Sequence, residues 1–407
     1  MLSRRRFLAV GSAVIVEGLA STSQLLGQQL PSSQLVAQSD DPLCGWRGKL
    51  NIHPVAPDQN RHSIHSYFNT CPESPDGNFV LYYTSATADG QTGDLRILER
   101  ATGKERIIAS NIHTEDAHRV ACQQWISNGK RVVFHDFRKG TTCVVVIDLD
   151  SGSERVLAWD RLVWWGVPTG DVVPIYGRQW DPGTYTDLYL LNVVTGEIQT
   201  PTTAAAVREK YPDGVAEWFG DKPISICFPA LSPDSTRIFF KLAHSTIPAN
   251  GNFRSITAVK REGLVGYDLR QRDFLFYNRE WGHPAWLSDS VTISNIGPVL
   301  INSNTGIAQP IPGVPKFPGS HPSVMPDSKL FITDTTTENF DGSKSIWGVA
   351  VGDIHGYQWK LITSFDGSHG ATTWRHNHPH PVTNRFNNRI YFNVNATQWT
   401  QLYVAEL

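Results

Sequence analysis

This sequence has almost no excess of charge of either sign. Its 407 residues include 36 Lys and Arg against 38 Asp and Glu, which leaves a net charge of −2 at pH 7. A nearly neutral chain does not attract nucleic-acid phosphates or anionic lipid head groups over a distance. We therefore expect no nucleic-acid partner and no electrostatic attachment to a membrane.

Long hydrophobic runs are also missing. The most apolar stretch, residues 9–26, is broken by Glu17 and by several Gly and Ser residues, so it is too short and too polar to span a bilayer. It follows Ser3-Arg4-Arg5-Arg6-Phe7-Leu8, a pattern typical of twin-arginine export signals. We predict a cleaved signal peptide and linker over residues 1–38, a folded domain over residues 39–407, and a periplasmic or secreted protein. The alternative is a basic N-terminus ahead of a membrane anchor.

Cysteine is sparse, and several catalytic motifs are absent. The five cysteines are scattered without a C-x-x-C pair, and their odd number leaves at least one thiol outside any disulfide. In a chain with a core of this size we interpret them mainly as small buried apolar residues. The sequence has no Gly-x-Ser-x-Gly elbow of a serine hydrolase and no glycine-rich loop of a phosphate-binding site. It therefore argues against both classes.

Helical patterns are sparse as well, and a β repeat takes their place. Each unit has a polar turn, an alternating apolar strand, a second strand, another turn and a third strand. Seven such turns begin at Ser74, Ser127, Pro168, Ser232, Leu287, Met325 and Asn384. Seven sheets arranged radially leave only short edges exposed. We predict an all-β fold, a seven-bladed β-propeller with four-stranded antiparallel blades; a pair of β-sandwiches is the alternative, but it does not explain the repetition.

Three further details of the fold are predicted. The last unit shows two clear strands, at residues 389–394 and 401–406, so a segment near residues 47–52 is expected to complete its sheet and close the ring. One short helix is expected on a loop at residues 204–211. The aspartates within the turn markers are interpreted as turn residues: Asp76, Asp234, Asp289 and Asp327.

Histidines recur at matched positions in three successive units. A His-Pro pair begins at His283, His321 and His380, each just before a turn marker, and His378 lies two residues before His380. Residues two apart on an extended strand point to the same side, so we expect the imidazoles to converge near the central axis. Imidazole suits a borderline divalent ion such as Zn²⁺ or Mn²⁺ better than Ca²⁺. We predict that these four histidines bind a divalent metal ion; the alternative is that each satisfies backbone groups at the channel mouth.

A second constellation lies in the second and third units. His135 and Tyr176 occupy corresponding places there, and Arg178 follows Tyr176 by two residues. Elimination from a uronate needs a cation to neutralise the carboxylate, a base to remove the neighbouring proton, and an acid to protonate the departing oxygen. We predict this role for the three residues; the alternative is that Tyr176 packs between blades and His135 is a loop residue. The acidic pair at residues 115–116 is a weaker candidate, for a glycosidase.

Three segments resemble the propeller-type polysaccharide lyases. Residues 65–77 (HSYFNTCPESPDG) and 114–125 (TEDAHRVACQQW) resemble the early blades of ulvan-lyase-like proteins, and residues 378–381 (HPHP) resemble the oligogalacturonate lyases. The resemblance implies a seven-bladed propeller that binds a divalent metal through histidines and eliminates across a uronate linkage. It also implies that His321, His378 and His380 are metal ligands and that His283 is the base or a further ligand.

One residue departs from the oligogalacturonate lyase pattern. That family has a Gln ligand three residues before the first histidine of the pair, where this chain has Arg375, whose guanidinium cannot bind a metal. The resemblance to the ulvan-type relatives then implies a structural metal and a catalytic set of His118, His135, Tyr176 and Arg178.

These observations together predict an exported polysaccharide lyase that cleaves a uronate-containing glycan, ulvan-like or pectic, by β-elimination. The expected partner is an acidic polysaccharide or oligosaccharide, and the protein is expected to be a monomer. The alternatives are a non-catalytic carbohydrate- or protein-binding propeller and a propeller glycoside hydrolase.

Overall fold

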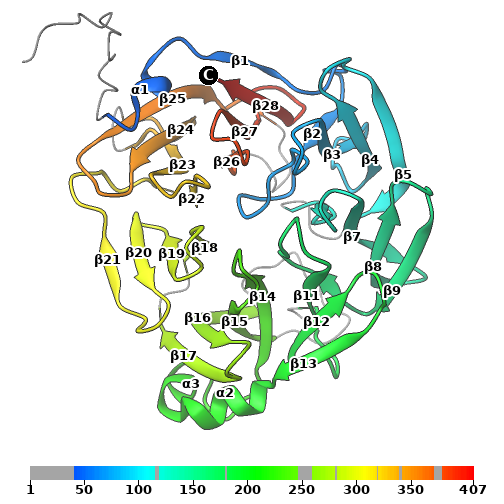
Figure 1. Cartoon of the computed structure of the whole chain (residues 1–407), viewed down its shortest axis with the longest axis vertical. Helices are drawn as coiled ribbons and strands as arrows, with labels where there is room; N and C mark the ends of the chain where they lie inside the picture. Colours follow the sequence, from blue (N-terminus) through cyan, green and yellow to red (C-terminus); the bar gives the residue numbers. More distant parts are fainter. Residues whose placement is uncertain are drawn as a thin grey trace, which may run out of the picture. The chain divides into compact units, whose positions relative to one another are not determined.

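Seven small sheets form a ring around a central axis (Figure 1). The computed structural model describes residues 41–114, 119–178, 181–245, 259–279, 282–318, 320–338, 342–370 and 378–407. Within these residues the chain forms seven four-stranded sheets, and the recorded strand pairs are antiparallel. The predicted seven-bladed propeller is therefore confirmed.

Each blade contributes one strand to each of four concentric positions. The innermost strands are β2 (His62–Ile64), β6 (Gln124–Ile126), β10 (Leu162–Val163), β14 (Ser225–Leu231), β18 (Ala285–Trp286), β22 (Ser323–Val324) and β26 (Val382–Thr383). The second strands are β3 (Phe79–Ser85), β7 (Arg131–Arg138), β11 (Val172–Tyr176), β15 (Arg237–Ser245), β19 (Thr292–Asn295), β23 (Leu330–Thr336) and β27 (Arg389–Val394). The third strands are β4 (Thr92–Glu99), β8 (Thr141–Asp148), β12 (Leu188–Asn192), β16 (Val259–Asp268), β20 (Val299–Asn302), β24 (Ile346–Asp353) and β28 (Gln401–Glu406). The outermost strands are β5 (Glu105–His113), β9 (Glu154–Trp159), β13 (Ile198–Thr202), β17 (Asp273–Asn278), β21 (Ala308–Pro310), β25 (Trp359–Asp366) and β1 (Asn51–Pro54).

The seventh blade joins the two ends of the described chain. β1 pairs with β28 from Asn51 opposite Glu406 to Pro54 opposite Tyr403, so an N-terminal strand completes a sheet otherwise built from the C-terminus. The predicted closing segment is thus confirmed, but its bounds were wrong. Residues 44–47 form a short helix, α1 (Cys44–Arg47), because the Asp41 carboxylate accepts hydrogen bonds from the Leu43 N–H and from Arg47 Nε.

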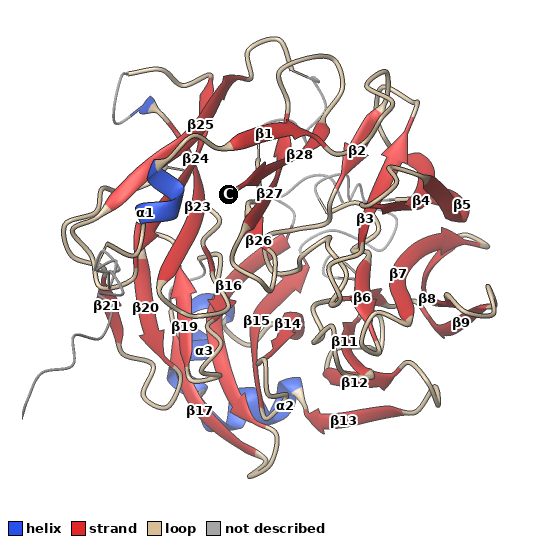
Figure 2. Ribbon diagram, turned by 45° about the horizontal axis from the view of Figure 1, so that its top comes forward, coloured by secondary structure: helices blue, strands red, loops and turns tan. Residues whose placement is uncertain are grey.

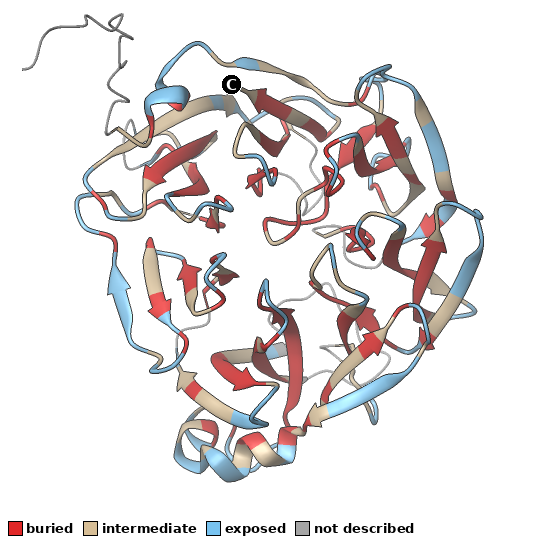
Figure 3. Ribbon diagram, in the orientation of Figure 1, coloured by how far each residue is buried: buried red, intermediate tan, exposed pale blue. Residues whose placement is uncertain are grey.

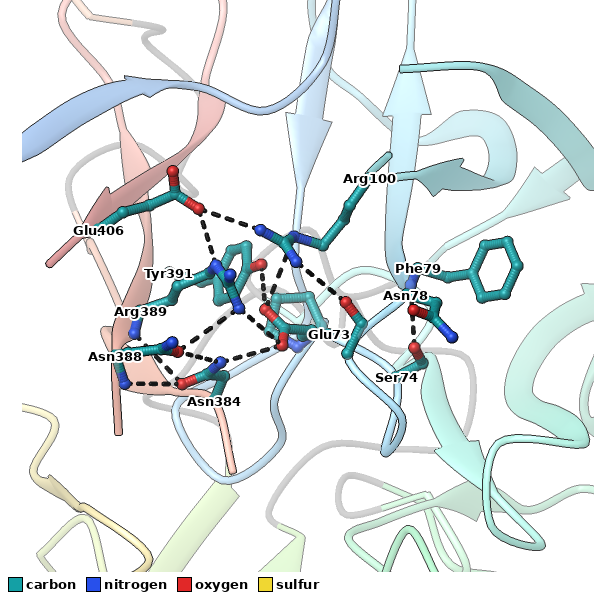
Figure 4. Close-up of polar contacts among 12 residues, drawn as sticks. Glu73, Ser74, Asn78, Phe79, Arg100, Asn384, Asn388, Arg389, Tyr391 and Glu406 are labelled. Carbon is teal, nitrogen blue, oxygen red and sulfur yellow. Dashed lines mark hydrogen bonds and ion pairs between the residues drawn. The ribbon is translucent and has the colours of Figure 1, made fainter. Parts of the chain in front are cut away.

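A buried carboxylate reinforces this closure from the first blade. Glu73 follows β2, and its side chain is 1% exposed. Its oxygens accept hydrogen bonds from Asn384 Nδ2 at 3.0 Å and from the Tyr391 hydroxyl at 2.5 Å, and Arg389 Nη1 lies 3.4 Å away (Figure 4). Those three partners belong to the seventh blade. Burial and the neighbouring Glu73 carboxylate raise the pKa of the Tyr391 phenol, so the hydroxyl remains a donor.

The aspartates of the turn markers make the predicted Asx turns. The Asp234 carboxylate accepts hydrogen bonds from the Thr236 N–H and the Ser232 hydroxyl, and Asp76, Asp289 and Asp327 accept from backbone N–H groups two residues ahead. In the first marker the next residue is Gly77, with φ +79°, where a Cβ would lie 2.8 Å from the Phe386 ring. Glycine is therefore required at this turn for both reasons.

Two helices, α2 and α3, lie outside the ring, between β13 and β14 (Figure 1). α2 (Ala204–Lys210) is the predicted helix, and the Thr203 hydroxyl caps it by accepting from the Ala206 N–H. A second helix, α3 (Pro212–Phe219), was missed; Pro212 at its first position starts it directly after α2. Val207 and Phe219 pack these helices against the fourth blade. None of the described helices has the length and apolar character needed to cross a membrane.

Burial decreases from the axis outward (Figure 3). Every residue of β14 is buried, whereas every residue of the outer strand β21 is exposed. The core lies between neighbouring blades, because its clusters combine buried apolar side chains from more than one blade. Figure 2 shows the blades side by side around the ring. All five cysteines are free thiols; Cys122, Cys143 and Cys227 are buried as predicted, and Cys44 is exposed.

Candidate active site

Three of the four predicted metal-binding histidines converge at the centre of the ring. One ring nitrogen from each of His321, His378 and His380 lies within 4.8 Å of the others. The His321 ring centroid is 4.4 Å from that of His380 and 4.9 Å from that of His378, with the ring planes nearly perpendicular in both pairs. His321 and His380 are buried, and His378 is partly exposed. We call these three residues the histidine cluster.

His283 lies against this cluster rather than within the group of three. Its ring stacks on His321, with centroids 4.2 Å apart and an interplanar angle of 23°. Its Nδ1 lies 2.9 Å from the Ser320 carbonyl and donates to it, so Nε2 keeps the lone pair. Burial lowers the pKa of His283, which favours the neutral imidazole.

The histidines lie on the segments that enter the innermost strands. His321 and His380 each precede a two-residue strand, β22 or β26, by two residues. His380 has φ +47°, so the alternation of an extended strand does not explain why His378 and His380 face the same space. The convergence predicted from the sequence is present, but residues 378–381 do not form the extended strand assumed for it, and His380 has a left-handed backbone conformation.

The carboxylate of Asp334 organises the cluster. It lies on β23, is fully buried, and accepts backbone hydrogen bonds from the His321 N–H at 2.6 Å and the His380 N–H at 3.0 Å. Its Oδ2 is also 3.0 Å from His321 Nδ1, so that nitrogen carries the proton and Nε2 keeps its lone pair. Burial raises the pKa of Asp334 and lowers that of His321. Sequence reasoning missed Asp334.

Asp334 occupies a position that recurs around the ring. It is the fifth residue of its second strand, and the fifth residues of five other second strands are also buried: Tyr83, His135, Tyr176, Lys241 and Asn393. Several of these side chains bind the segment that enters the next blade. Lys241 Nζ donates to the Gly282 carbonyl, and Asn393 Oδ1 accepts from the His65 N–H. The fifth position therefore joins neighbouring blades beside the histidine cluster. We call the region formed by the cluster, His283 and Asp334 the mouth.

Two of the predicted catalytic residues, Tyr176 and Arg178, have different kinds of neighbours: Tyr176 packs among aromatic rings, and Arg178 donates hydrogen bonds to hydroxyls. The Tyr176 ring, which is 2% exposed, lies 5.9 Å from Trp164 and 5.7 Å from Phe228. Arg178 Nη2 and Nε donate to the Thr141 and Thr142 hydroxyls, at the start of β8.

His135 is buried on β7, and its N–H donates to the Ala121 carbonyl. His118, the fourth residue of that set, and Arg375 lie outside the described residues. The catalytic roles of His118, His135, Tyr176 and Arg178 remain predictions.

Two aromatic residues of the segment 65–77 line the cluster. The Tyr67 ring lies 4.6 Å from His380 and 5.7 Å from His321, and Phe68 lies 5.3 Å from His321. Both rings are buried. Arg119, from the segment 114–125, is placed over the Tyr67 ring at 5.8 Å. The two segments that resemble early lyase blades therefore meet at the histidine cluster.

The donor set fits a divalent metal ion. Three imidazoles whose nitrogens lie within 4.8 Å of one another supply the donor type of the three-histidine sites that hold Zn²⁺. The carboxylate–histidine contact of Asp334 is the outer-shell arrangement common to such sites.

Replacing Asp334 by Asn is expected to weaken metal binding by roughly 10–100-fold, because an amide orients His321 less firmly than a carboxylate. Titration of the metal-free protein with Zn²⁺ and Mn²⁺ measures this change. Asn393→Ala is the matched control, since it removes the side chain at the corresponding strand position of the next blade. It is expected to leave metal affinity unchanged. An Asp334→Asn protein with wild-type affinity would show that Asp334 has no orienting role.

Comparison with known proteins confirms the fold. Neither a family model nor a curated protein sequence matches this chain. An oligogalacturonate lyase from Vibrio parahaemolyticus superposes with a TM-score of 0.58 and 14% identity over 88% of this chain and 97% of that one. An oligogalacturonate lyase in complex with manganese superposes with a TM-score of 0.58 and 12% identity over 88% and 96%.

A structure from a study of two prolyl endopeptidases is also similar, with a TM-score of 0.50 and 11% identity over 84% of this chain and 51% of that one. Peptidases and lyases thus share this architecture, and at such identities the likeness establishes the propeller fold alone. The resemblance to propeller lyases noted in the sequence extends to the fold.

Proposed function

We propose that this chain is a polysaccharide lyase that cleaves a uronate-containing glycan, pectic or ulvan-like, by β-elimination at the mouth holding the histidine cluster. The observation that carries the proposal is the convergence of His321, His378 and His380. The Asp334 carboxylate orients the imidazole of His321 within this cluster. Support also comes from the similarity in fold to oligogalacturonate lyases, one of them in complex with manganese.

The reaction sets the chemical requirements of the site. A base removes the proton at C5 of the uronate, a double bond forms between C4 and C5, the bond from C4 to the glycosidic oxygen breaks, and an acid protonates that oxygen. The C5 proton is weakly acidic until the charge of the adjoining carboxylate is neutralised. When bound, a divalent ion at the histidine cluster would place positive charge beside that carboxylate.

Neutral imidazoles and a phenol supply the proton transfers in this proposal. His135 and Tyr176 are the predicted pair, at the same position of adjacent blades. His283 is the alternative base, because its Nε2 keeps a lone pair beside the cluster. A base and an acid placed within reach of one sugar each contribute about 10²–10⁴-fold to the rate.

Replacing Tyr176 by Phe is expected to lower the elimination rate by about 100-fold or more while leaving the melting temperature nearly unchanged. The reason is that the change deletes one hydroxyl and keeps the ring that packs on Trp164 and Phe228. Tyr83→Phe is the matched control, because Tyr83 occupies the same position in the first blade and its hydroxyl donates to the Gly90 carbonyl. If Tyr176→Phe retains wild-type turnover, His283 becomes the residue to test.

We also infer export through the twin-arginine signal, on the basis of Arg4 and Arg5 within residues that the structure does not describe. Replacing both with Lys is expected to retain the precursor in the cytoplasm, because the receptor recognises the paired arginines. Cell fractionation and immunoblotting of a bacterial host that has the twin-arginine translocase measure the result. An unchanged periplasmic yield would contradict the assignment.

A further inference from the structure

We propose that Arg119 binds a carboxylate of the substrate, so that the mouth selects uronate sugars over neutral ones; this inference rests on the proposed function and adds to it. Arg119 lies among the aromatic rings around the histidine cluster.

Aromatic rings from three blades hold the Arg119 guanidinium. Its Cζ lies 5.0 Å from the Phe228 ring centroid, 5.1 Å from that of Trp164 and 5.8 Å from that of Tyr67. Stacking on aromatic faces stabilises a guanidinium through its plane. The N–H donors point along the edges of that plane, which is the geometry in which Arg grips a carboxylate with two hydrogen bonds.

Those rings connect Arg119 to both candidate reaction centres. Tyr67 contacts His321 and His380 on the metal side. Trp164 and Phe228 contact the Tyr176 ring. Arg119 therefore shares aromatic neighbours with the histidine cluster and with the predicted acid. In the proposed reaction the carboxylate of the reacting sugar lies between these two groups.

The electrostatics of the mouth agree with an anionic ligand. Burial lowers the pKa of Lys241, and the positive charges of Arg261 and then Arg119 lower it further. A cation that disfavours further positive charge nearby favours a bound anion. A uronate carboxylate meets both the charge and the bidentate geometry.

The test measures binding of galacturonate and glucuronate, with galactose and glucose as their neutral counterparts, by calorimetry on the full mature chain. These monosaccharides have no glycosidic bond, so binding is measured apart from cleavage. The wild-type protein is expected to bind each uronate at least about tenfold more tightly than its neutral counterpart. Arg119→Gln is expected to remove this preference. Lys139→Gln is the matched control, because it removes a cation that stacks on the exposed ring of Trp159, and it is expected to keep the preference.

Two outcomes would overturn the inference: a wild-type protein with no preference for uronates, or an Arg119→Gln protein that retains the preference. If Arg119→Gln does not fold, Arg119→Lys serves as the test, because it keeps the charge and loses the planar guanidinium. The inference requires that this variant bind uronates with a smaller preference over neutral sugars than wild type. A protein that prefers uronates through Arg119 but releases no unsaturated product would support this inference and refute the proposed lyase function. If the protein cleaves the glycan and uronate binding does not depend on Arg119, the inference about Arg119 is refuted and the proposed lyase function stands.

Discussion

A protein in which His378 and His380 are both changed to alanine is expected to contain no divalent metal after purification. The change removes two of the three imidazoles whose nitrogens lie within 4.8 Å of one another. A single remaining imidazole does not retain an ion against dilution. Elemental analysis of freshly folded wild-type and variant proteins measures the metal content, which should fall from one ion per chain to none.

Loss of the ion is also expected to lower the melting temperature and the elimination rate. A ligand that binds only the folded state, at 1,000 times its Kd, stabilises that state by about 4 kcal/mol. Added Zn²⁺ or Mn²⁺ should therefore raise the melting temperature of the wild-type protein and leave that of the variant unchanged. The control is His355→Ala/His369→Ala, which removes two exposed histidines from outside the cluster. Wild-type protein without stoichiometric metal would contradict the metal assignment.

Replacing Glu73 by Ala is expected to destabilise the protein by about 3–5 kcal/mol, because removing one partner of a buried ionic network leaves the others uncompensated. The Tyr391 hydroxyl and the Asn384 amide would lose their acceptor, and Arg389 would lose one of its two carboxylate partners, keeping Glu406. Chemical denaturation measures the loss. Since these residues join the seventh blade to the first, the loss should also reduce the cooperativity of unfolding.

Two variants separate this effect from a general effect of charge. Glu73→Gln keeps the shape of the side chain and one acceptor oxygen. Its free energy of unfolding should therefore lie between those of the wild-type and Glu73→Ala proteins. Glu338→Ala removes the acid of an exposed pair with Lys344, and it should cost less than about 1 kcal/mol. A Glu73→Ala protein with wild-type stability would show that the ring closes through β1 and β28 alone.

The fold could be predicted from the sequence because local patterns repeat seven times. The Asp234 and Asp289 turns, the strand lengths and the unfinished last sheet are all determined by residues close together in the chain. The closing strand was also anticipated, but its bounds depended on α1, which forms through contacts of Asp41 that have no pattern of their own. α3 was missed because Pro212 reads as the end of α2 rather than as the start of another helix.

The candidate site was only partly predictable. The matched His-Pro pairs led to the histidine cluster, since equivalent positions of a ring lie near the same axis. Asp334 could have been found as an acid in an otherwise apolar or hydroxylic strand, at the position that His135 and Tyr176 share. The approach of Tyr67 and Arg119 to the cluster depends on loops that cross between blades, so residues far apart in sequence meet there without any local signal.

The central claim is that this mouth performs β-elimination on a uronate linkage. The direct measurement is the ultraviolet absorbance of the product, recorded while metal-loaded wild-type protein acts on pectic, ulvan-type and glucuronan substrates. Elimination creates a conjugated C4–C5 double bond, and hydrolysis does not. We predict a steady rise in absorbance with at least one substrate, lost in the His378→Ala/His380→Ala protein. Binding of these glycans without any rise would contradict the account and identify a non-catalytic carbohydrate-binding propeller, and reducing ends released without the double bond would identify a glycoside hydrolase.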